Sequence, residues 1–368
     1  MATVVLAGGG TAGHVEPALA VARQWKMSHP DDHLIFLGTT SGLENTLVPA
    51  AHFELHLIPR VRVSRRPAPS WLKIPIDLIA AVRESKKVLK SADVLIGFGG
   101  YVSAPAYIAA WLSRTPSVIH EANAKPGWAN RLGAVFSQHL AVAHPVESGK
   151  FEAALLAGLP LRSDVAKAFE QSQADWAGAR QAAKVRLGFP ADRPLIFVMG
   201  GSQGSVAINK VIEASVEIFN QQGVSLLHSV GKLNSLPQAR GAYHPVAYVE
   251  AMADAYLAAD VIIGRSGAVT CSEFRALGRY ALFVPLPIGN GEQFVNAASL
   301  VAENRAEVMN QKDFTPDFLK AHMTSLLNKS AAAPNNYISC QISIGHGFNI
   351  GHRLIPATGL WQSIELSN

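Results

Sequence analysis

The sequence has very little cysteine: Cys271 and Cys340 are the only two in 368 residues. Two cysteines cannot build a disulfide framework or a four-cysteine zinc site, and this low usage is typical of proteins in a reducing cytosol. Charged residues are also few, at 16% against 49% hydrophobic residues, which excludes a disordered charged segment and a coiled coil. We therefore expect packed domains, and the length fits two of roughly 100 to 200 residues each.

No apolar run is long and continuous enough to predict a transmembrane helix. The longest stretch without a charged residue, Val94 to Ser113, is interrupted by Gly97, Gly99, Gly100 and Pro105, which favours strand, turn and helix. The amino terminus has no basic segment ahead of its apolar residues, so we expect no signal peptide and no export.

Several catalytic signatures are absent. No two aspartates have the Asp-x-Asp spacing of metal-dependent transferases, and neither a Walker lysine nor a Gly-x-Ser-x-Gly motif occurs. His14-Val15-Glu16 is similar to the histidine motif of zinc deaminases, but their Pro-Cys-x-x-Cys partner is missing. We therefore expect chemistry without a metal ion, a serine nucleophile, a P-loop or a cofactor.

The sequence does contain a repeated unit of strand, glycine loop and helix. The first unit is Ala2 to Leu6, the loop Gly8 to Gly13 and a helical pattern through Trp25. Further strands are predicted at Val94 to Phe98, Val118-Ile119, Leu195 to Met199, Val224 to His228, Val261 to Gly264 and, before a helix at Met252 to Ala258, Val246 to Val249. Because strands alternate with helices, we expect an α/β fold with two doubly wound parallel sheets.

The two halves are connected by Leu159 to Arg193, which contains Pro160 and Pro190, has an Ala/Gln-rich helical centre and is followed by Pro194. We expect an amino-terminal domain over residues 1–160 and a carboxyl-terminal domain over residues 161–333. Residues 334–368 contain only Arg353 and Glu365 as charged residues and form an atypical tail. Doubly wound sheets bind ligands beyond the carboxyl ends of their strands, so a cleft shared by the two halves is the expected site.

The loop Gly8-x-Gly10-x-x-Gly13 formally matches the dinucleotide fingerprint. A dehydrogenase also needs an acidic residue at the end of its second strand, and here that strand, His33 to Leu37, ends in Gly38-Thr39-Thr40. NAD binding is therefore not favoured. His14 follows the loop, either as a polar cap residue or as a general base, since a helix N-terminus disfavours the charged imidazolium.

A second candidate site is the run Arg265-Ser266-Gly267 followed by Ala268 to Glu273, after a buried-type strand. Small hydroxylated residues at a helix start are ordinary caps. The same free N–H groups and hydroxyls can also hold a nucleotide diphosphate, while Glu273 accepts hydrogen bonds from ribose hydroxyls. The two interpretations are compatible.

Positive charge is concentrated between Arg60 and Lys90, where nine basic and two acidic residues give a net charge of +7, against +5 for the whole chain. Apolar residues such as Trp71, Ile76 and Ile79 are interleaved with these cations. Such a stretch is either a solvated loop and helix or a surface for anionic lipid. Nucleic acid is not expected, because no nucleic-acid-binding motif accompanies the charge.

Six motifs together, in this order and spacing, resemble the MurG family of bacterial peptidoglycan glycosyltransferases. They cover about Val4 to Asn304: Gly9-Gly10-Thr11-Ala12-Gly13-His14, Gly97-Phe98-Gly99-Gly100-Tyr101-Val102-Ser103, His120-Glu121-Ala122-Asn123, Gly200-Gly201-Ser202-Gln203-Gly204, Arg265-Ser266-Gly267-Ala268, and Gln293 with Asn296-Ala297. The resemblance implies a GT-B fold with two Rossmann-like domains. Ala12 stands where the family usually has glycine, and the tail after about Ala333 departs from the charged helix with which members usually end.

The resemblance also implies roles for individual residues. His14 corresponds to the family's favoured general base, with Tyr101 and Asn130 beside it in the acceptor site. Thr11, Ala12 and Gly13 would line the donor sugar and diphosphate, and Asn123 would contact the N-acetylglucosamine. The remaining implied contacts hold the UDP portion: Arg162, Ser202, Val249, Ala268, Val269, Thr270, Cys271, Ser272, Glu273 and Gln293.

The activity implied by the resemblance is an inverting transfer, without metal, of N-acetylglucosamine from UDP-N-acetylglucosamine to the C4 hydroxyl of the muramic acid in lipid I, giving lipid II. It would take place at the cytoplasmic face of the bacterial cell membrane, on a peripheral protein. Two alternatives stay open: another UDP-sugar glycosyltransferase or epimerase of the same superfamily, and a UDP-sugar-binding protein whose divergent tail impairs catalysis.

Overall fold

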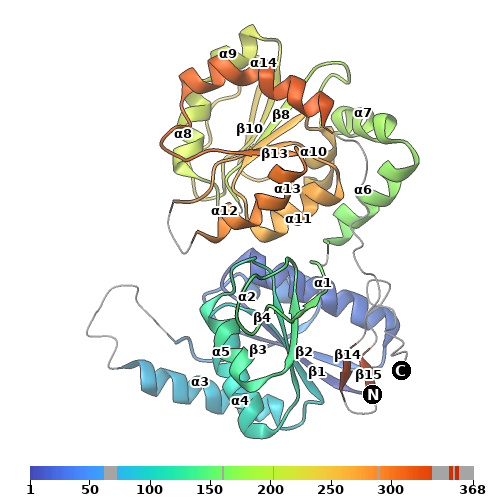
Figure 1. The fold of residues 1–368 in the computed structure, drawn as a ribbon, viewed down its shortest axis with the longest axis vertical. Coiled ribbons are helices and arrows are strands. Elements are labelled where there is room, and N and C mark those ends of the chain that lie inside the picture. Colours follow the sequence, from blue (N-terminus) through green and yellow to red (C-terminus); the bar gives the residue numbers. More distant parts are fainter. Residues whose placement is uncertain are drawn as a thin grey trace. The chain divides into compact units, whose positions relative to one another are not determined.

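The computed structural model describes residues 1–61, 73–159, 161–201, 203–287, 291–333, 348–350 and 353–355. The chain divides into two compact units (Figure 1). Unit 1 comprises Met1–Pro160 together with Gln341–Asn368, and unit 2 comprises Leu161–Cys340. The described part of the tail contains β14 (Phe348–Ile350) and β15 (Arg353–Ile355), which pair antiparallel.

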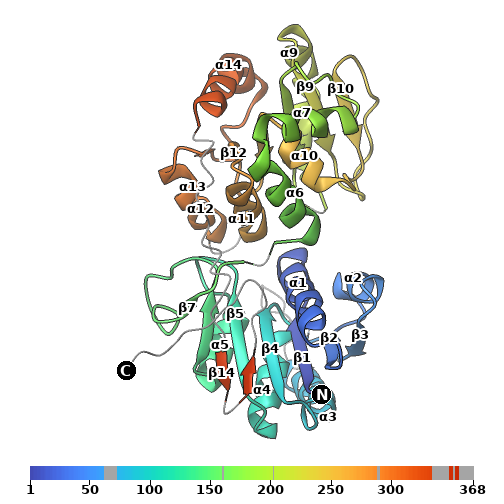
Figure 2. The same cartoon turned by 90° about the vertical axis from the view of Figure 1, so that its right-hand side faces the viewer.

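Unit 1 is built on a seven-stranded parallel sheet in the order β3-β2-β1-β4-β5-β6-β7. Figure 2 shows these strands side by side. Their bounds are β1 Thr3–Gly8, β2 His33–Gly38, β3 Glu54–Leu57, β4 Val94–Gly99, β5 Ser117–Glu121, β6 His139–Val142 and β7 Leu155–Leu156. The order reverses between β1 and β4, and such a switch point is where open α/β sheets bind ligands.

Helices cover both faces of this sheet because its central strands are apolar on both sides. In β1, Val5 and Ala7 pack in one core with α3 (Ile74–Leu89), α4 (Ser103–Ser113) and α5 (Trp128–Phe136). Val4 and Leu6 pack in a second core with α1 (Ala12–Ser28) and α2 (Glu44–Ala50). Helices α1 and α4 therefore leave the sheet on opposite faces (Figure 1).

Unit 2 repeats this plan with a six-stranded parallel sheet in the order β10-β9-β8-β11-β12-β13. The strands are β8 Leu195–Met199, β9 Ser225–Ser229, β10 Tyr243–Val246, β11 Val261–Gly264, β12 Ala281–Phe283 and β13 Ala306–Val308. All neighbours are parallel. The order again reverses at the strand that begins the glycine-rich motif, between β8 and β11.

The helices of unit 2 also lie on both faces of its sheet. One core joins the sheet to α6 (Ser163–Ala174), α7 (Trp176–Arg186), α10 (Met252–Ala258), α11 (Ala268–Ala276) and α13 (Ala298–Ala302). The other joins it to α8 (Val206–Ala214), α9 (Val216–Gln221) and α14 (Pro316–Ala332). The short helix α12 (Glu292–Asn296) follows β12.

The predicted fold of two doubly wound parallel sheets is confirmed. One strand prediction was wrong: residues 246–249 were expected to form a strand, but β10 ends at Val246. The residues that pair with β9 begin earlier, at Tyr243, and Val249 lies in a loop. Among the described helices, none combines the length and apolar character that crossing a bilayer requires.

Candidate functional site

Three loops of unit 1 lie at the carboxyl ends of the adjacent strands β1, β4 and β5. They are the glycine loop before α1, the Gly99 to Val102 turn before α4, and the loop from Ala122 to Gly127 before α5. The first two are in close contact, because a Cβ on Gly100 would lie 2.3 Å from the carbonyl oxygen of Gly9. Glycine at 99 and 100 has positive φ, 91° and 80°, so both residues also need its conformational freedom.

His14 is half-buried in the first turn of α1 and faces the turn after β4. A Cβ on Gly100 would lie 3.2 Å from its Nδ1, and a Cβ on Gly99 would lie 3.2 Å from its Cδ2. Its Nδ1 is 3.1 Å from the hydroxyl oxygen of Thr11. The ring is therefore held between the two glycine loops at the switch point of the sheet.

Burial lowers the pKa of His14 below its ordinary value, and this effect exceeds three opposing influences. The carboxylates of Glu121 and Glu44 and the backbone of Gly9 all favour the charged ring and raise its pKa. The net result is a neutral imidazole near pH 7, which can accept a proton.

A buried carboxylate, Glu121, organises the loop after β5. It accepts hydrogen bonds from Asn123 (backbone N–H at 2.9 Å and Nδ2 at 3.1 Å), from the Gly127 N–H at 2.9 Å and from Asn130 Nδ2 at 3.0 Å. Tyr107 donates its hydroxyl to Asn130 Oδ1 at 2.7 Å. Asn123 and Asn130, both predicted from the sequence, are thus joined through one carboxylate that the sequence analysis did not single out as a site residue.

Tyr101, predicted on the acceptor side, packs against the glycine loop. A Cβ on Gly10 would lie 2.7 Å from its ring carbon Cε1. The Arg60 guanidinium lies 5.1 Å from the centre of the same ring and donates a hydrogen bond to Ser41 Oγ at 3.0 Å. An aromatic ring and a cation are therefore placed beside the loop that carries His14.

Unit 2 contains a hollow of about 420 Å³ at the carboxyl edge of its sheet. Its lining brings together two of the predicted motifs and residues near Gln293: Gly200, Gly201, Gly204, Ser205, Val206, Ala207, Arg265, Gly267, Thr270, Leu286 and Gln293. A volume of this size suits a small ligand or a part of a larger one.

Two helix N-termini open on this hollow. In α11 the first hydrogen bond of the helix runs from the Cys271 N–H to the Gly267 carbonyl at 2.9 Å, so the N–H groups of 268–270 have no helical acceptor. In α8 the Ile208 N–H is capped by Ser205 Oγ at 3.4 Å, and the two preceding N–H groups lie ahead of the first helical bond. Oriented N–H groups at two helix starts form a site suited to an anion.

Two side chains complete the rim of the hollow. Gln293 Oε1 accepts the Leu286 N–H at 2.9 Å, which turns the Nε2 donor the other way. Arg265 donates to the carbonyls of Val284 and Pro285 at 2.7 and 3.0 Å, to Ser205 Oγ at 2.7 Å and to Gln311 Oε1 at 2.8 Å. Arg265 therefore ties the two helix starts to the loop after β12.

Arg162 and Glu273, both predicted to contact the nucleotide, form an ion pair in unit 2. Arg162 Nε donates to Glu273 Oε1 at 2.7 Å. Burial raises the pKa of Glu273, although Arg162 opposes it, and the Tyr256 hydroxyl also contacts this carboxylate. Arg162 Nη2 is buried and has no hydrogen-bond acceptor within the described part of the chain.

The structure does not bring every predicted donor residue to the hollow. Val249 and Cys271 lie in the hydrophobic core, and burial raises the pKa of the Cys271 thiol. Ala268 and Val269 lie at the start of α11, whereas Ser272 is half-buried one turn further on. Ser202 lies outside the described residues, as do Arg62, Arg65, Arg66 and Trp71 of the basic stretch.

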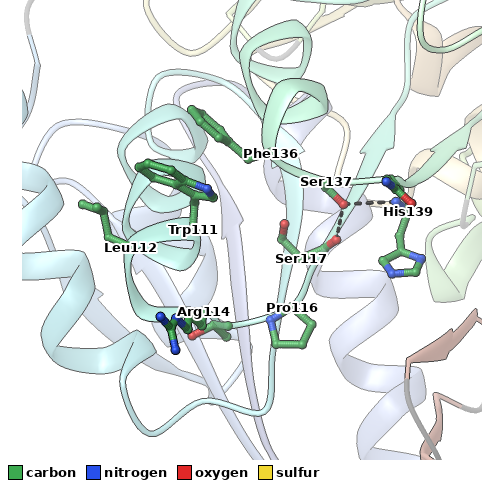
Figure 3. A pocket seen from close by; sticks show the side chains of 10 residues that line it. Trp111, Leu112, Arg114, Pro116, Ser117, Phe136, Ser137 and His139 are labelled. Atoms are coloured by element: carbon green, nitrogen blue, oxygen red, sulfur yellow. Dashed lines mark hydrogen bonds between the residues drawn. The ribbon is translucent and has the colours of Figure 1, made fainter.

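A second hollow, of about 640 Å³, lies in unit 1 between Trp111, Phe136, Ser137 and His139 (Figure 3). It is larger, but it lies at the amino ends of β5 and β6, the edge opposite the glycine loops. Ser137 Oγ is already engaged, donating to the Ser117 carbonyl at 2.5 Å. None of the predicted site residues lines this hollow, so we do not assign the predicted chemistry to it.

Within the described ranges no group of three or more His, Cys, Asp or Glu residues is arranged to hold a metal ion.

Comparison with known proteins gives a consistent result for both units. Residues 4–142 match the glycosyltransferase family 28 N-terminal domain, and residues 195–343 match the glycosyltransferase family 28 C-terminal domain. The chain is 45% identical to a protein of Paenarthrobacter aurescens (88% of this chain, 87% of the other) and 45% identical to one of Corynebacterium glutamicum strain R (96% and 98%). Both are named UDP-N-acetylglucosamine–N-acetylmuramyl-(pentapeptide) pyrophosphoryl-undecaprenol N-acetylglucosamine transferase. Among solved structures, Acinetobacter baumannii MurG superposes with a TM-score of 0.69 at 27% identity, covering 92% of this chain and 95% of that one.

Proposed function

The chain belongs to glycosyltransferase family 28, and from this premise we propose that it transfers N-acetylglucosamine from UDP-N-acetylglucosamine to lipid I, the undecaprenyl-pyrophosphoryl N-acetylmuramyl pentapeptide, giving lipid II. The two 45% identical relatives carry this activity in their names. In this proposal residues 1–160 form the acceptor and membrane-facing domain and residues 161–333 form the UDP-sugar-binding domain.

The observation that carries the proposal is the hollow of unit 2, where the starts of α8 and α11 converge. A glycosyl transfer that releases UDP leaves negative charge on the diphosphate. Preorganised N–H donors aimed at that charge stabilise the transition state more than the ground state. The N–H groups at 268–270, the Thr270 hydroxyl and Gln293 Nε2 would supply such donors, with Ser202 as a further contact.

His14 is the proposed general base. With its proton on Nδ1, the ring donates to Thr11 Oγ1 and leaves the lone pair of Nε2 free. The acceptor C4 oxygen then bonds to the anomeric carbon of the donor as the bond from that carbon to the UDP oxygen breaks, and the hydroxyl proton moves to Nε2. A single displacement of this kind inverts the anomeric configuration.

The positions of the other predicted residues support further proposed contacts. Thr11, Ala12 and Gly13 present the N-terminus of α1 to the donor sugar, and Asn123, held by Glu121, would contact its acetamido group. Arg162 Nη2 and the Glu273 carboxylate would hold the nucleoside. The backbone at Val249 is proposed to face the uracil, since the Val249 side chain is in the core.

We also propose that the protein acts at the cytoplasmic face of the membrane, bound to anionic lipid through α3. This helix exposes Ile76 and Ile79, and it carries Arg83, Lys86 and Lys87. Exposed apolar side chains next to cations are the combination that binds an anionic lipid surface. No metal ion and no cofactor take part in the proposed reaction.

A panel of acceptors tests this proposal. The protein is incubated with UDP-N-acetylglucosamine and, in separate samples, a lipid I analogue, other sugar acceptors and no acceptor. We expect transfer to the lipid I analogue alone. Transfer to a different acceptor, or conversion of free UDP-N-acetylglucosamine to its 2-epimer, would replace the proposed function with another activity, and tight UDP binding without any product would indicate a binding protein.

A further inference from the structure

The glycine loop of unit 1 matches the dinucleotide fingerprint, but the proposed function assigns no ligand to its backbone N–H groups. In a dinucleotide-binding fold these groups bind a diphosphate. Here the Gly10 N–H donates to Glu44 Oε2 at 2.9 Å. An anion of the chain itself therefore takes part of the position that a diphosphate has in other doubly wound domains.

Glu44 is fully buried at the first position of α2. Its other oxygen, Oε1, accepts the Thr39 N–H at 3.0 Å and the Thr39 hydroxyl at 3.1 Å. All three donors are uncharged, so the carboxylate is stabilised by directed hydrogen bonds rather than by a cation. Burying a carboxylate in this way is unfavourable unless such donors are fixed in place, which makes the geometry of the Gly10 turn and the Thr39 turn depend on Glu44.

The glycines around this side chain are explained by the room it needs. A Cβ on Gly42 would lie 2.0 Å from Glu44 Oε2, and one on Gly38 would lie 2.6 Å from Glu44 Cγ. A Cβ on Gly9 would lie 2.4 Å from Val102 Cγ2 and 3.0 Å from Glu44 Oε1. None of these three has a positive φ, so space rather than backbone conformation requires glycine there. Gly38 and Gly42 thus form a cradle for the Glu44 side chain, and Gly9 lies beside its carboxylate.

The turn that Glu44 holds is in contact with the proposed acceptor machinery. Tyr101 packs on Gly10, and the Gly9 carbonyl packs on Gly100, which in turn contacts His14. Resting on the proposed function, we propose that Glu44 is a positioning residue for the transfer reaction: its carboxylate fixes the glycine loop so that His14 and Tyr101 meet the acceptor. It acts through the loop and does not touch substrate.

The test compares Glu44→Gln with the wild-type protein. Glutamine keeps the shape, but it cannot accept at both positions, so one donor of Gly10 or Thr39 faces an amide NH₂. We expect kcat to fall by roughly 10-fold to 100-fold, the scale of a misplaced reacting group. The affinity for UDP should stay within about twofold, because the nucleotide hollow lies in unit 2.

A matched control is Asp260→Asn in unit 2. Asp260 is also a hydrogen-bonded carboxylate, accepting from the Leu195 N–H, Arg180 and Lys184 at the amino end of β8. This variant should lower the melting temperature and leave kcat unchanged. If Glu44→Gln behaves like Asp260→Asn, with a lower melting temperature but a wild-type kcat per folded molecule, the positioning role is refuted.

A second variant addresses the cradle without removing the carboxylate. Gly42→Ala places a methyl group against Glu44 and should lower kcat as Glu44→Gln does. In a Glu44→Ala background the same substitution should have no further effect, because the three nearest atoms that the methyl group meets all belong to Glu44. Equal effects of Gly42→Ala in the two backgrounds would contradict the proposal.

One readout does not depend on activity. The ring ¹⁵N signals of His14 should shift in Glu44→Gln and stay in place in Asp260→Asn. A wild-type protein that transfers nothing would end the proposed function, whereas unchanged His14 signals in Glu44→Gln would end this inference, so the two failures are distinguishable.

Discussion

At the scale of single residues, burial and nearby charges have opposite effects on the protonation of His14. Burial between the two glycine loops disfavours the imidazolium, while Glu121 and Glu44 favour it, and burial prevails. His14 Nδ1 is engaged with Thr11 Oγ1, and the proposed mechanism places the ring proton on this nitrogen so that Nε2 acts as the base. A neutral ring in this place is consistent with a base that works near pH 7.

The lowered pKa of His14 predicts how kcat depends on pH. Because the pKa of His14 lies below 6.5, the acidic limb of kcat should also lie below pH 6.5, since activity requires the neutral ring. His14→Ala should lower kcat by roughly 10² and remove that limb, with UDP affinity near the wild-type value. The measurement is kcat for both proteins between about pH 5 and 8, the range over which histidine usually titrates. An acidic limb that persists unchanged in His14→Ala would show that another group is the base.

Residue types and spacing singled out His14, and the family resemblance added Asn123 and Gln293, but neither identified the buried carboxylates that organise the loops. Glu44 follows the second strand by a few residues, close to where a dehydrogenase would have its ribose-binding acid. Its side chain turns back to the glycine loop, which sequence alone does not reveal. Alanine at position 12 fits the backbone found there, because Ala12 begins α1 and does not have a positive φ.

At the scale of elements, the N-terminus of α11 is the part that we propose faces the diphosphate. Its N-cap, Gly267, has φ −68° and ψ 151°, the extended conformation that a residue before proline adopts. Proline at the next position, 268, would therefore fit the backbone and remove one N–H donor.

Ala268→Pro should consequently weaken UDP binding by about tenfold, the equivalent of one hydrogen bond of about 1.4 kcal/mol. Calorimetric titration with UDP measures this, and the melting temperature should change little. Unaltered UDP affinity in the folded variant would show that this N–H group does not face the diphosphate.

Helix α3 gives an independent prediction about the membrane. Ile76 and Ile79 are 68% and 54% exposed, so replacing either by serine should not unfold the protein. Each replacement should lower binding to anionic vesicles by about tenfold, or about 1.4 kcal/mol. Val185→Ser, at a 63% exposed position of α7, is the matched control and should leave vesicle binding unchanged. Equal losses in α3 and α7 variants would refute a specific role of α3.

The positions of several strands could be predicted closely from the sequence. The recurring strand, glycine loop and helix gave β8 and β11 with their observed bounds, because runs of apolar residues buried on both faces are distinctive. The strand predicted at residues 246–249 was wrong. Val246 and Val249 are both apolar, but Val249 belongs to a loop and is buried in the core. Composition alone does not distinguish a buried loop residue, which pairs with no neighbouring strand, from a residue of a buried strand.

At the scale of the whole molecule, the chemistry is divided between two similar units. In unit 2 the starts of α8 and α11 line a hollow that we propose holds the diphosphate, whereas in unit 1 the Gly10 N–H donates to Glu44 and His14 lies beside the loop. The same strand, loop and helix plan therefore serves two purposes, and which one applies depends on what fills the glycine loop. Fold alone would not have distinguished them.

The most direct test is a transfer assay with radiolabelled UDP-N-acetylglucosamine and a lipid I analogue in the presence of a chelator. The account predicts release of one UDP for each disaccharide formed, with a β linkage from inversion of the α-linked donor. A folded protein that forms no disaccharide, or that forms it only when a divalent cation is restored, would contradict it.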